Sequence, residues 1–256
     1  MENKRLLKIL LTNDDSIKSD LLYSLALSLS EIASVFVVAP ETEQSGVSHA
    51  FTSRAGLILK RTDEQKFASY SLSGTPSDCI KFAISQNLCD SRPDLIFSGI
   101  NFGENAGVSS LYSGTVAGAR EGALWNIPSI ALSLTDKKSH LKTALTFAKE
   151  IVLNRYFESM TPFTFWNVNF PSESVPFQGI TLAKMSVSMF SDHYEKKETL
   201  YFLDGVKNLK NANPETDDFL LASGFATIVP HKIDQTSLTE SERIKQLNFK
   251  LSKKDS

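Results

Sequence analysis

Residues 6–15 read Leu6-Leu7-Lys8-Ile9-Leu10-Leu11-Thr12-Asn13-Asp14-Asp15, an apolar run that ends in an amide and two adjacent carboxylates. A short apolar run of this kind predicts a buried strand of an α/β sheet, and such sheets bind ligands at the carboxyl ends of their strands. Two like charges about 5 Å apart repel by roughly 3 kcal/mol at an effective dielectric of about 20. A hard divalent cation between the carboxylates would offset that repulsion. The alternative is a solvated turn that caps the next helix.

The sequence on either side of this run alternates between strand and helix patterns. Apolar residues at helical spacing predict a helix over 19–31, and the run 35–39 predicts a second strand that ends at Pro40. Together they form a β-α-β unit with a right-handed crossover. Residues 41–48 are a polar loop, and 50–72 are extended. The following elements are a helix at 75–87 that begins with a Thr75-Pro76-Ser77-Asp78 capping pattern, a strand at 94–98, a glycine-rich stretch at 99–114, a helix at 115–124, a strand at 128–134 and a helix at 141–153.

This alternation predicts an α/β fold with a Rossmann-like, doubly wound, mostly parallel sheet and helices on both faces. The pattern weakens after about residue 155, where we expect strands at 163–170, 179–189 and 222–230, a hairpin within 192–211 and a charged surface helix from about 241. We therefore expect one domain over 1–256. It has a core at about 5–155, returning strands at about 160–230 and a C-terminal hairpin and helix extension at about 190–256.

The composition excludes several classes of protein. A chain of 256 residues with 41% hydrophobic content is large enough to bury the core of such a domain. The net charge of -2 and the scattered basic residues predict no groove for nucleic acid. No apolar stretch approaches the ~18 residues that a membrane span needs. The sequence contains two cysteines and nothing that resembles a signal peptide, so we expect a cytoplasmic protein in a reducing compartment.

Oxygen-bearing side chains follow three of the early predicted strands. The loops contribute Asn13, Asp14 and Asp15, then Gln44, Ser45 and Ser48, then Ser98, Asn101 and Asn105. Because the carboxyl ends of parallel strands converge, we expect an open site for a hard cation that also holds a substrate phosphate. Ser113-Gly114-Thr115 then opens the small-residue helix, whose free N–H groups predict an anion cradle. Ordinary capping by Ser113 or Thr115 is the alternative there.

The sequence offers no protein nucleophile for phosphoryl transfer. The first strand lacks an Asp-x-Asp pair, and the chain has neither a Cys-x5-Arg loop nor a Gly-x-Ser-x-Gly elbow. The remaining route is an activated water, with Asp14 or Asp15 as general base. His49 either contacts phosphate or makes a structural hydrogen bond, and we favour the second. We expect packing or peripheral positions for His140, His193, His231, Cys79 and Trp125, with Trp125 in the core.

Four separated motifs together resemble the SurE (survival protein E) family. They are Ile9-Leu10-Leu11-Thr12-Asn13-Asp14-Asp15, Val38-Ala39-Pro40 with Gln44-Ser45-Gly46, Gly74-Thr75-Pro76-Ser77-Asp78-Cys79, and Ser98-Gly99-Ile100-Asn101 through Asn105 to Tyr112-Ser113-Gly114-Thr115-Val116. The match covers residues 5 to about 135. A weaker resemblance covers two later segments, Thr216-Asp217-Asp218 and Ala222-Ser223-Gly224-Phe225.

The resemblance implies a metal-dependent phosphatase that hydrolyses nucleoside 5′-monophosphates, with one Mg²⁺ or Mn²⁺ per subunit. It also implies a homodimer or homotetramer in which a C-terminal hairpin or helix is exchanged. The metal ligands it implies are Asp14, Asp15, Ser45 and Asn101. The catalytic residues are Asp14, Asp15, Asn105 and Ser113, of which the last two lie on the phosphate side, and further substrate or phosphate contacts come from Asn13, Ser45, Gly46, Asn101, Gly114 and Thr115.

Two other interpretations remain open at this point. A receiver-like signalling module also places an acidic pair after its first strand, but here Ser98-Gly99 stands where such a module needs its phosphorylated aspartate. A catalytically silent nucleotide-binding homologue is the second, because the chain has Ser16 where the family usually has glycine. If that position requires φ > 0, serine costs about 1 kcal/mol there.

Overall fold

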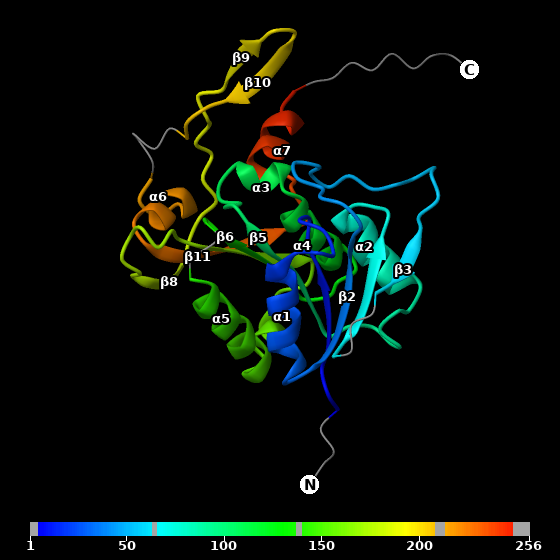
Figure 1. The fold of residues 1–256 in the computed structure, drawn as a ribbon. Helices are drawn as coiled ribbons and strands as arrows, with labels where there is room; N and C mark the ends of the chain where they lie inside the picture. Colours follow the sequence, from blue (N-terminus) through cyan, green and yellow to red (C-terminus); the bar gives the residue numbers. More distant parts are fainter. Residues whose placement is uncertain (1–4, 63–65, 137–139, 208–212, 248–256) are drawn as a thin grey trace, which may run out of the picture.

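A nine-stranded mixed sheet runs through the computed structural model, which describes residues 5–62, 66–136, 140–207 and 213–247 (Figure 1). Its strand order is β3-β4-β2-β1-β5-β6-β7-β11-β8. The bounds are β1 Lys8–Thr12, β2 Ser34–Pro40, β3 Leu59–Arg61, β4 Ala68–Leu72, β5 Leu95–Phe102, β6 Ser129–Leu134, β7 Thr164–Phe170, β8 Gly179–Leu182 and β11 Phe225–Lys232. The strands from β4 to β7 in this order are all parallel, whereas β3 and β11 join the sheet antiparallel to their neighbours β4 and β7. The predicted mostly parallel sheet is confirmed.

Helices cover both faces of this sheet, as the sequence predicted (Figure 1). Helices α1 (Asp20–Ser30) and α5 (Leu141–Leu153) pack on one face, and α2 (Pro76–Ser85) and α4 (Gly114–Leu124) on the other. Alternate residues of β1 serve the two cores, since Ile9 and Leu11 pack beneath α1 and α5 while Leu10 packs against α2. The apolar run is therefore continuous because both faces of the strand are buried.

The chain leaves the centre of the sheet in two directions. From β1 it runs outward through β2 to β4, and from β5 it runs the other way through β6 to β7. The switch point lies between β1 and β5, and this is where open α/β sheets bind their ligands. The acidic pair follows β1 directly, so the fold places both carboxylates at that point.

The structure also contains elements that the sequence did not predict. Strand β5 continues past the expected residue 98 to Phe102, with a register shift between Ser98 and Asn101 in its pairing with β6. The short helices α3 (Ser109–Tyr112), η1 (Tyr156–Ser159) and α6 (Asp217–Ala222) were not expected. Trp125 was expected in the core, which is wrong, because 37% of its surface is exposed.

A separate hairpin of β9 (His193–Lys197) and β10 (Leu200–Asp204) extends away from the main sheet, and α7 (Leu238–Lys245) lies near the end of the chain (Figure 1). The predicted hairpin at 192–211 is thus confirmed in its described part, while residues 208–211 lie outside the described residues. The surface helix expected from about 241 begins at Leu238. Among the described residues, the helices are all too short or too polar to span a bilayer.

Candidate active site

Most of the predicted site residues line one open pocket of about 250 Å³ at the carboxyl ends of β1, β2 and β5. The predicted residues in its lining are Asp14, Ser45, Gly46, Asn101, Asn105 and Ser113. They come from three loops separated by 30 to 60 residues of sequence, so it is the parallel sheet that brings them together. The other predicted site residues are not part of this lining; they are Asp15, Asn13, Gly114 and Thr115.

Asp14 is held by the first turn of α4. The backbone N–H of Thr115 donates to Asp14 Oδ2 at 3.1 Å, and the Thr115 hydroxyl donates to Asp14 Oδ1. Burial raises the pKa of Asp14 to about 6, the charge of Asp15 adds to this increase, and the hydrogen bonds from Thr115 oppose it. Because the carboxylate is only 4% exposed, its negative charge is costly without a nearby cation.

The N-terminus of α4 is therefore already partly satisfied by protein groups. Ser113 caps the helix by accepting a hydrogen bond from the Val116 N–H at 3.1 Å. The predicted capping by Ser113 is therefore present, and the anion cradle stays a prediction. Gly114 lies against Asp14, because a Cβ at this position would stand 2.9 Å from Asp14 Cβ. A glycine is needed there for the carboxylate to approach the helix so closely.

Asp15 lies beside Asp14 but faces a second open pocket of about 500 Å³. Its Oδ2 accepts a hydrogen bond from the Phe102 N–H at 3.3 Å. Phe102 lines both pockets, so the two pockets adjoin at the end of β5. Lys18 and Glu43 also line the second pocket, which gives it charges of both signs.

The remaining proposed metal ligands present oxygen atoms. The amide nitrogen of Asn101 donates to the Gly103 carbonyl at 2.7 Å, which leaves Oδ1 as the amide atom that is able to bind a cation. The Ser45 hydroxyl donates to Glu43 Oε1 at 2.7 Å, so its oxygen lone pairs remain to be shared. Two carboxylates, an amide oxygen and a hydroxyl suit a hard divalent ion such as Mg²⁺ or Mn²⁺.

Asn13 is fully buried and does not line either pocket among the described residues. Its Nδ2 donates to the Ser16 carbonyl at 2.9 Å, so its side chain closes the turn that carries the two aspartates. Ser16 has φ +82°, which is the left-handed conformation that the sequence analysis considered for this position.

Three polar residues that were not predicted from the sequence contact Asn105. The Asn105 N–H donates to Asn169 Oδ1 at 2.7 Å, Asn167 Nδ2 donates to the Asn105 carbonyl at 2.8 Å, and Asn105 Nδ2 donates to Ser133 Oγ at 2.8 Å. The available signal was the Asn-x-Asn pattern in a strand that is otherwise buried and apolar. Asp217 holds the same loop two residues further on, because its Oδ2 accepts from the Gly107 N–H at 2.7 Å.

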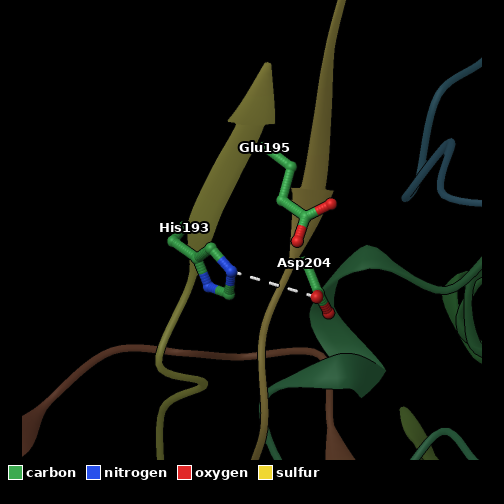
Figure 2. A group of neighbouring side chains, drawn as sticks. All are labelled: His193, Glu195 and Asp204. Carbon is green, nitrogen blue, oxygen red and sulfur yellow. Dashed lines mark ion pairs between the residues drawn. The ribbon is translucent and has the colours of Figure 1, made fainter. Parts of the chain in front are cut away.

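The favoured structural interpretation of His49 agrees with the geometry, since its Nε2 lies 2.9 Å from Glu121 Oε2 of α4. Cys79 is fully buried, as expected for packing. A group formed by His193, Glu195 and Asp204 lies on the exposed hairpin (Figure 2). Ion pairs of His193 with Asp204 at 3.9 Å and of Glu195 with Lys197 at 3.7 Å account for this group.

Comparison with known proteins identifies the family. Residues 9–192 match the family model described as Survival protein SurE. The 5′-nucleotidase SurE of Thermosipho africanus is 38% identical over 251 residues, which cover 94% of this chain and 96% of that protein. The chain belongs to the SurE family. The 5′-nucleotidase SurE of Chlorobaculum tepidum is 37% identical and covers 89% of each chain.

Structural comparison agrees with this assignment. The crystal structure of the SurE protein from Aquifex aeolicus matches with a TM-score of 0.80 and 29% sequence identity, over 93% of this chain and 98% of that one. The fold expected from the SurE resemblance is therefore confirmed. A receiver-like module does not fit a SurE protein, so that alternative is set aside.

Proposed function

We propose that this protein is a divalent-metal-dependent phosphatase that hydrolyses nucleoside 5′-monophosphates to nucleoside and phosphate. The relatives named 5′-nucleotidase SurE, which match almost the whole chain, support the reaction class. The observation that carries the proposal is the buried Asp14 carboxylate, which shares one pocket with the oxygen atoms of Ser45 and Asn101.

Asp14, Asp15, Ser45 and Asn101 would hold one Mg²⁺ or Mn²⁺. The chemistry that such an ion supplies when bound is polarisation of a phosphoryl oxygen and a lower pKa for a bound water. One of the two carboxylates would accept the proton of the attacking water. Burial raises the pKa of Asp14 to about 6 in the absence of an ion, and a bound cation would lower it, so both Asp14 and Asp15 are candidates for this base.

Other residues of the pocket would bind the substrate. Asn105 and Ser113 line the pocket and carry the polar groups proposed for the phosphate side. The adjoining 500 Å³ pocket is large enough for a nucleoside, and Phe102 lines both pockets. Binding of phosphate in one pocket and nucleoside in the other would favour a nucleotide over a small phosphate ester.

The activity test measures phosphate release from AMP and GMP with Mn²⁺ or Mg²⁺, for the wild type and for Asp14→Asn. We expect release that EDTA abolishes, and a rate at least about 100-fold lower in the variant, because a charged group at the reacting centre is lost. Asp90→Asn is the matched control, since Asp90 is exposed and its φ of +55° suits asparagine. Equal rates for the wild type and Asp14→Asn, or tight nucleotide binding without turnover, would contradict the proposal. The second result would indicate a catalytically silent homologue.

The finer expectations about assembly and location belong to the same proposal. We propose a homodimer or homotetramer that uses the exposed β9–β10 hairpin as its contact. We also propose a cytoplasmic location, for which the two free, buried cysteine thiols are the support.

A further inference from the structure

A row of polar side chains crosses the sheet beneath the pocket. Asn101 of β5 is in register with Ser133 of β6, Ser133 with Asn169 of β7, and Asn169 with Thr227 of β11. Asn167 lies on the same face of β7, two residues before Asn169. Ser133, Asn169 and Thr227 are fully buried, and buried polar groups are unfavourable unless hydrogen bonds satisfy them. Their presence in an otherwise apolar sheet therefore requires a reason.

The side chains of the two asparagines of β7 both form hydrogen bonds with one residue that lines the pocket, Asn105. Asn169 Oδ1 accepts from the backbone N–H of Asn105, and Asn167 Nδ2 donates to the backbone carbonyl of Asn105, at 2.7 and 2.8 Å. A backbone N–H is only a donor and a carbonyl only an acceptor, so these contacts determine which way each amide is oriented. Both backbone polar groups of Asn105 are thus hydrogen-bonded to β7, and the Asn105 side chain donates to Ser133 Oγ.

Strand β7 is held in the sheet by contacts that do not involve these amides. It is paired on both sides, by β6 and β11, and its core contacts come from Phe165, Val168 and Phe170. Asn167 Oδ1 and Asn169 Nδ2 have no hydrogen-bond partner among the described residues, so each amide uses the end that faces Asn105. These contacts satisfy the buried backbone N–H and carbonyl of Asn105, so the contribution of the two amides is to the placement of that residue.

We propose that Asn167 and Asn169 are positioning residues that hold the backbone of Asn105 and thereby aim its side chain into the catalytic pocket. The role of Asn105 toward phosphate is taken from the proposed function, and the positioning inference rests on it in that respect. The two asparagines act through Asn105 and do not themselves line the pocket.

Each contact can be kept or removed by a matched substitution. In Asn169→Asp the new side chain still offers an oxygen to the Asn105 N–H, and burial keeps the acid protonated. Asn167→Leu removes the amide that donates to the Asn105 carbonyl and adds no charge. We expect kcat for AMP with Mn²⁺ to fall roughly ten- to hundred-fold in Asn167→Leu, as for other small displacements of catalytic groups, and to stay within about three-fold in Asn169→Asp.

Two further variants complete the design. Asn169→Leu removes the acceptor without adding a charge, and we expect a loss of kcat similar to that of Asn167→Leu, which keeps the test open if the latter does not fold. Thr227→Val is the matched control. It lies beside Asn169 in the same polar row, and its hydroxyl has no partner among the described residues, so its kcat should equal that of the wild type.

Readouts other than kcat separate positioning from general damage. The dissociation constant for Mn²⁺ should stay within about two-fold of the wild type in every variant, because both β7 amides bind Asn105, which is not one of the proposed metal ligands. Hydrogen exchange of residues 101–107 should accelerate in Asn167→Leu and Asn169→Leu but not in Asn169→Asp or Thr227→Val.

Several results would overturn the inference. They are wild-type kcat in Asn167→Leu, equal losses in Asn167→Leu and Asn169→Asp, or losses that come with weakened Mn²⁺ binding. If the wild type released no phosphate at all, the proposed function would fail. The exchange pattern described above would still support the positioning role in that case, so the two failures are distinguishable.

Discussion

Ser16 adopts a strained backbone conformation at the turn that carries the two aspartates. Its φ is +82°, a value that costs a side chain with a Cβ about 1–2 kcal/mol. Asn13 helps to impose this turn by donating to the Ser16 carbonyl. The strain therefore lies in the backbone of the turn that carries the acidic pair, and it does not depend on the hydroxyl of Ser16.

Ser16→Gly should relieve this strain. We expect the free energy of unfolding to rise by about 1 kcal/mol and the melting temperature by about 2–4 °C, with unchanged hydrolysis of AMP. Ser16→Ala is the control, since alanine keeps the Cβ and should give no increase. A glycine variant that melts at or below the wild-type temperature would show that the turn is not strained.

Glu121 is a buried carboxylate of α4, only 2% exposed, and three partners surround it. Lys81 Nζ lies 2.9 Å from its Oε1, Trp125 Nε1 donates to the same oxygen at 2.9 Å, and His49 contacts Oε2. Burial raises the pKa of Glu121, but the hydrogen bonds from His49, Lys81 and Trp125 outweigh it and lower the pKa to about 2. This contact connects the loop after β2, which carries Ser45, to α4.

The lowered pKa of Glu121 predicts an acid-dependent loss of stability. An acid whose pKa in the folded state lies below its unfolded value stabilises the protein above about pH 4.5, and this contribution is lost as the pH falls toward 2. Glu121→Gln should lower the free energy of unfolding by roughly 3 kcal/mol at pH 6 and flatten its decline between pH 4.5 and 2. Denaturant titrations at several pH values measure this, with exposed Glu173→Gln as the control. Parallel curves for Glu121→Gln and the wild type would contradict the assignment.

At the scale of elements, α4 lies close to the sheet because its inner face carries glycine. A Cβ on Gly122 would stand 2.2 Å from Ser129 Oγ and 2.7 Å from Ile96 Cδ1. These atoms belong to β6 and β5, so the glycine sets the spacing between helix and strands. The same closeness lets the first turn of α4 reach Asp14.

Gly122→Ala should therefore destabilise the protein even though alanine is the better helix former. The gain in helix propensity is about 1 kcal/mol, whereas crowding of a packed core costs about 1–3 kcal/mol, and both close atoms belong to fully buried side chains that must shift to admit the Cβ. Gly56→Ala is the control, because no heavy atom lies within 4 Å of its added Cβ. Thermal unfolding of both variants measures the difference. An increase in melting temperature for Gly122→Ala would contradict the packing argument.

The elements that the sequence predicted well carry their own local signals. Helix α1 begins after the cap Ser19 and α2 after the capping box of Thr75 and Asp78, within one residue of expectation. The missed elements lack such signals. Helices α3 and α6 have only four and six residues, too few to show a periodicity. The last part of β5 is extended because Asn101 and Phe102 pair with β6, which a glycine-rich stretch does not reveal.

At the scale of the whole molecule, the β9–β10 hairpin is the part that the fold leaves uncovered (Figure 1). It carries exposed apolar side chains, and an isolated two-stranded sheet is only marginally stable in water. These side chains are Tyr194, Leu200, Tyr201, Phe202 and Leu203. Exposed apolar groups in such number are typical of a contact surface, in agreement with the proposed oligomer.

Replacement of residues 193–204 by a short Gly-Ser linker tests the proposed assembly. We expect light scattering to give a dimer or tetramer for the wild type and a monomer for the variant, because the apolar contact is lost. The single change Leu203→Lys should weaken the assembly in the same direction. A monomeric wild type, or a variant of unchanged mass, would contradict the role of the hairpin.

The sequence alone determined the alternation of strands and helices, the capped helix starts and the loops that carry Asp14 and Ser45. These features depend on periodicity and on short motifs, which each segment contains in itself. Only the tertiary structure decided that Thr115 holds Asp14, that Asp14 and Asp15 face neighbouring pockets, and that Asn105 is gripped by two asparagines 62 and 64 residues away. The physical reason is that such contacts depend on strand order and register, which arise when the whole sheet assembles and which no single segment encodes.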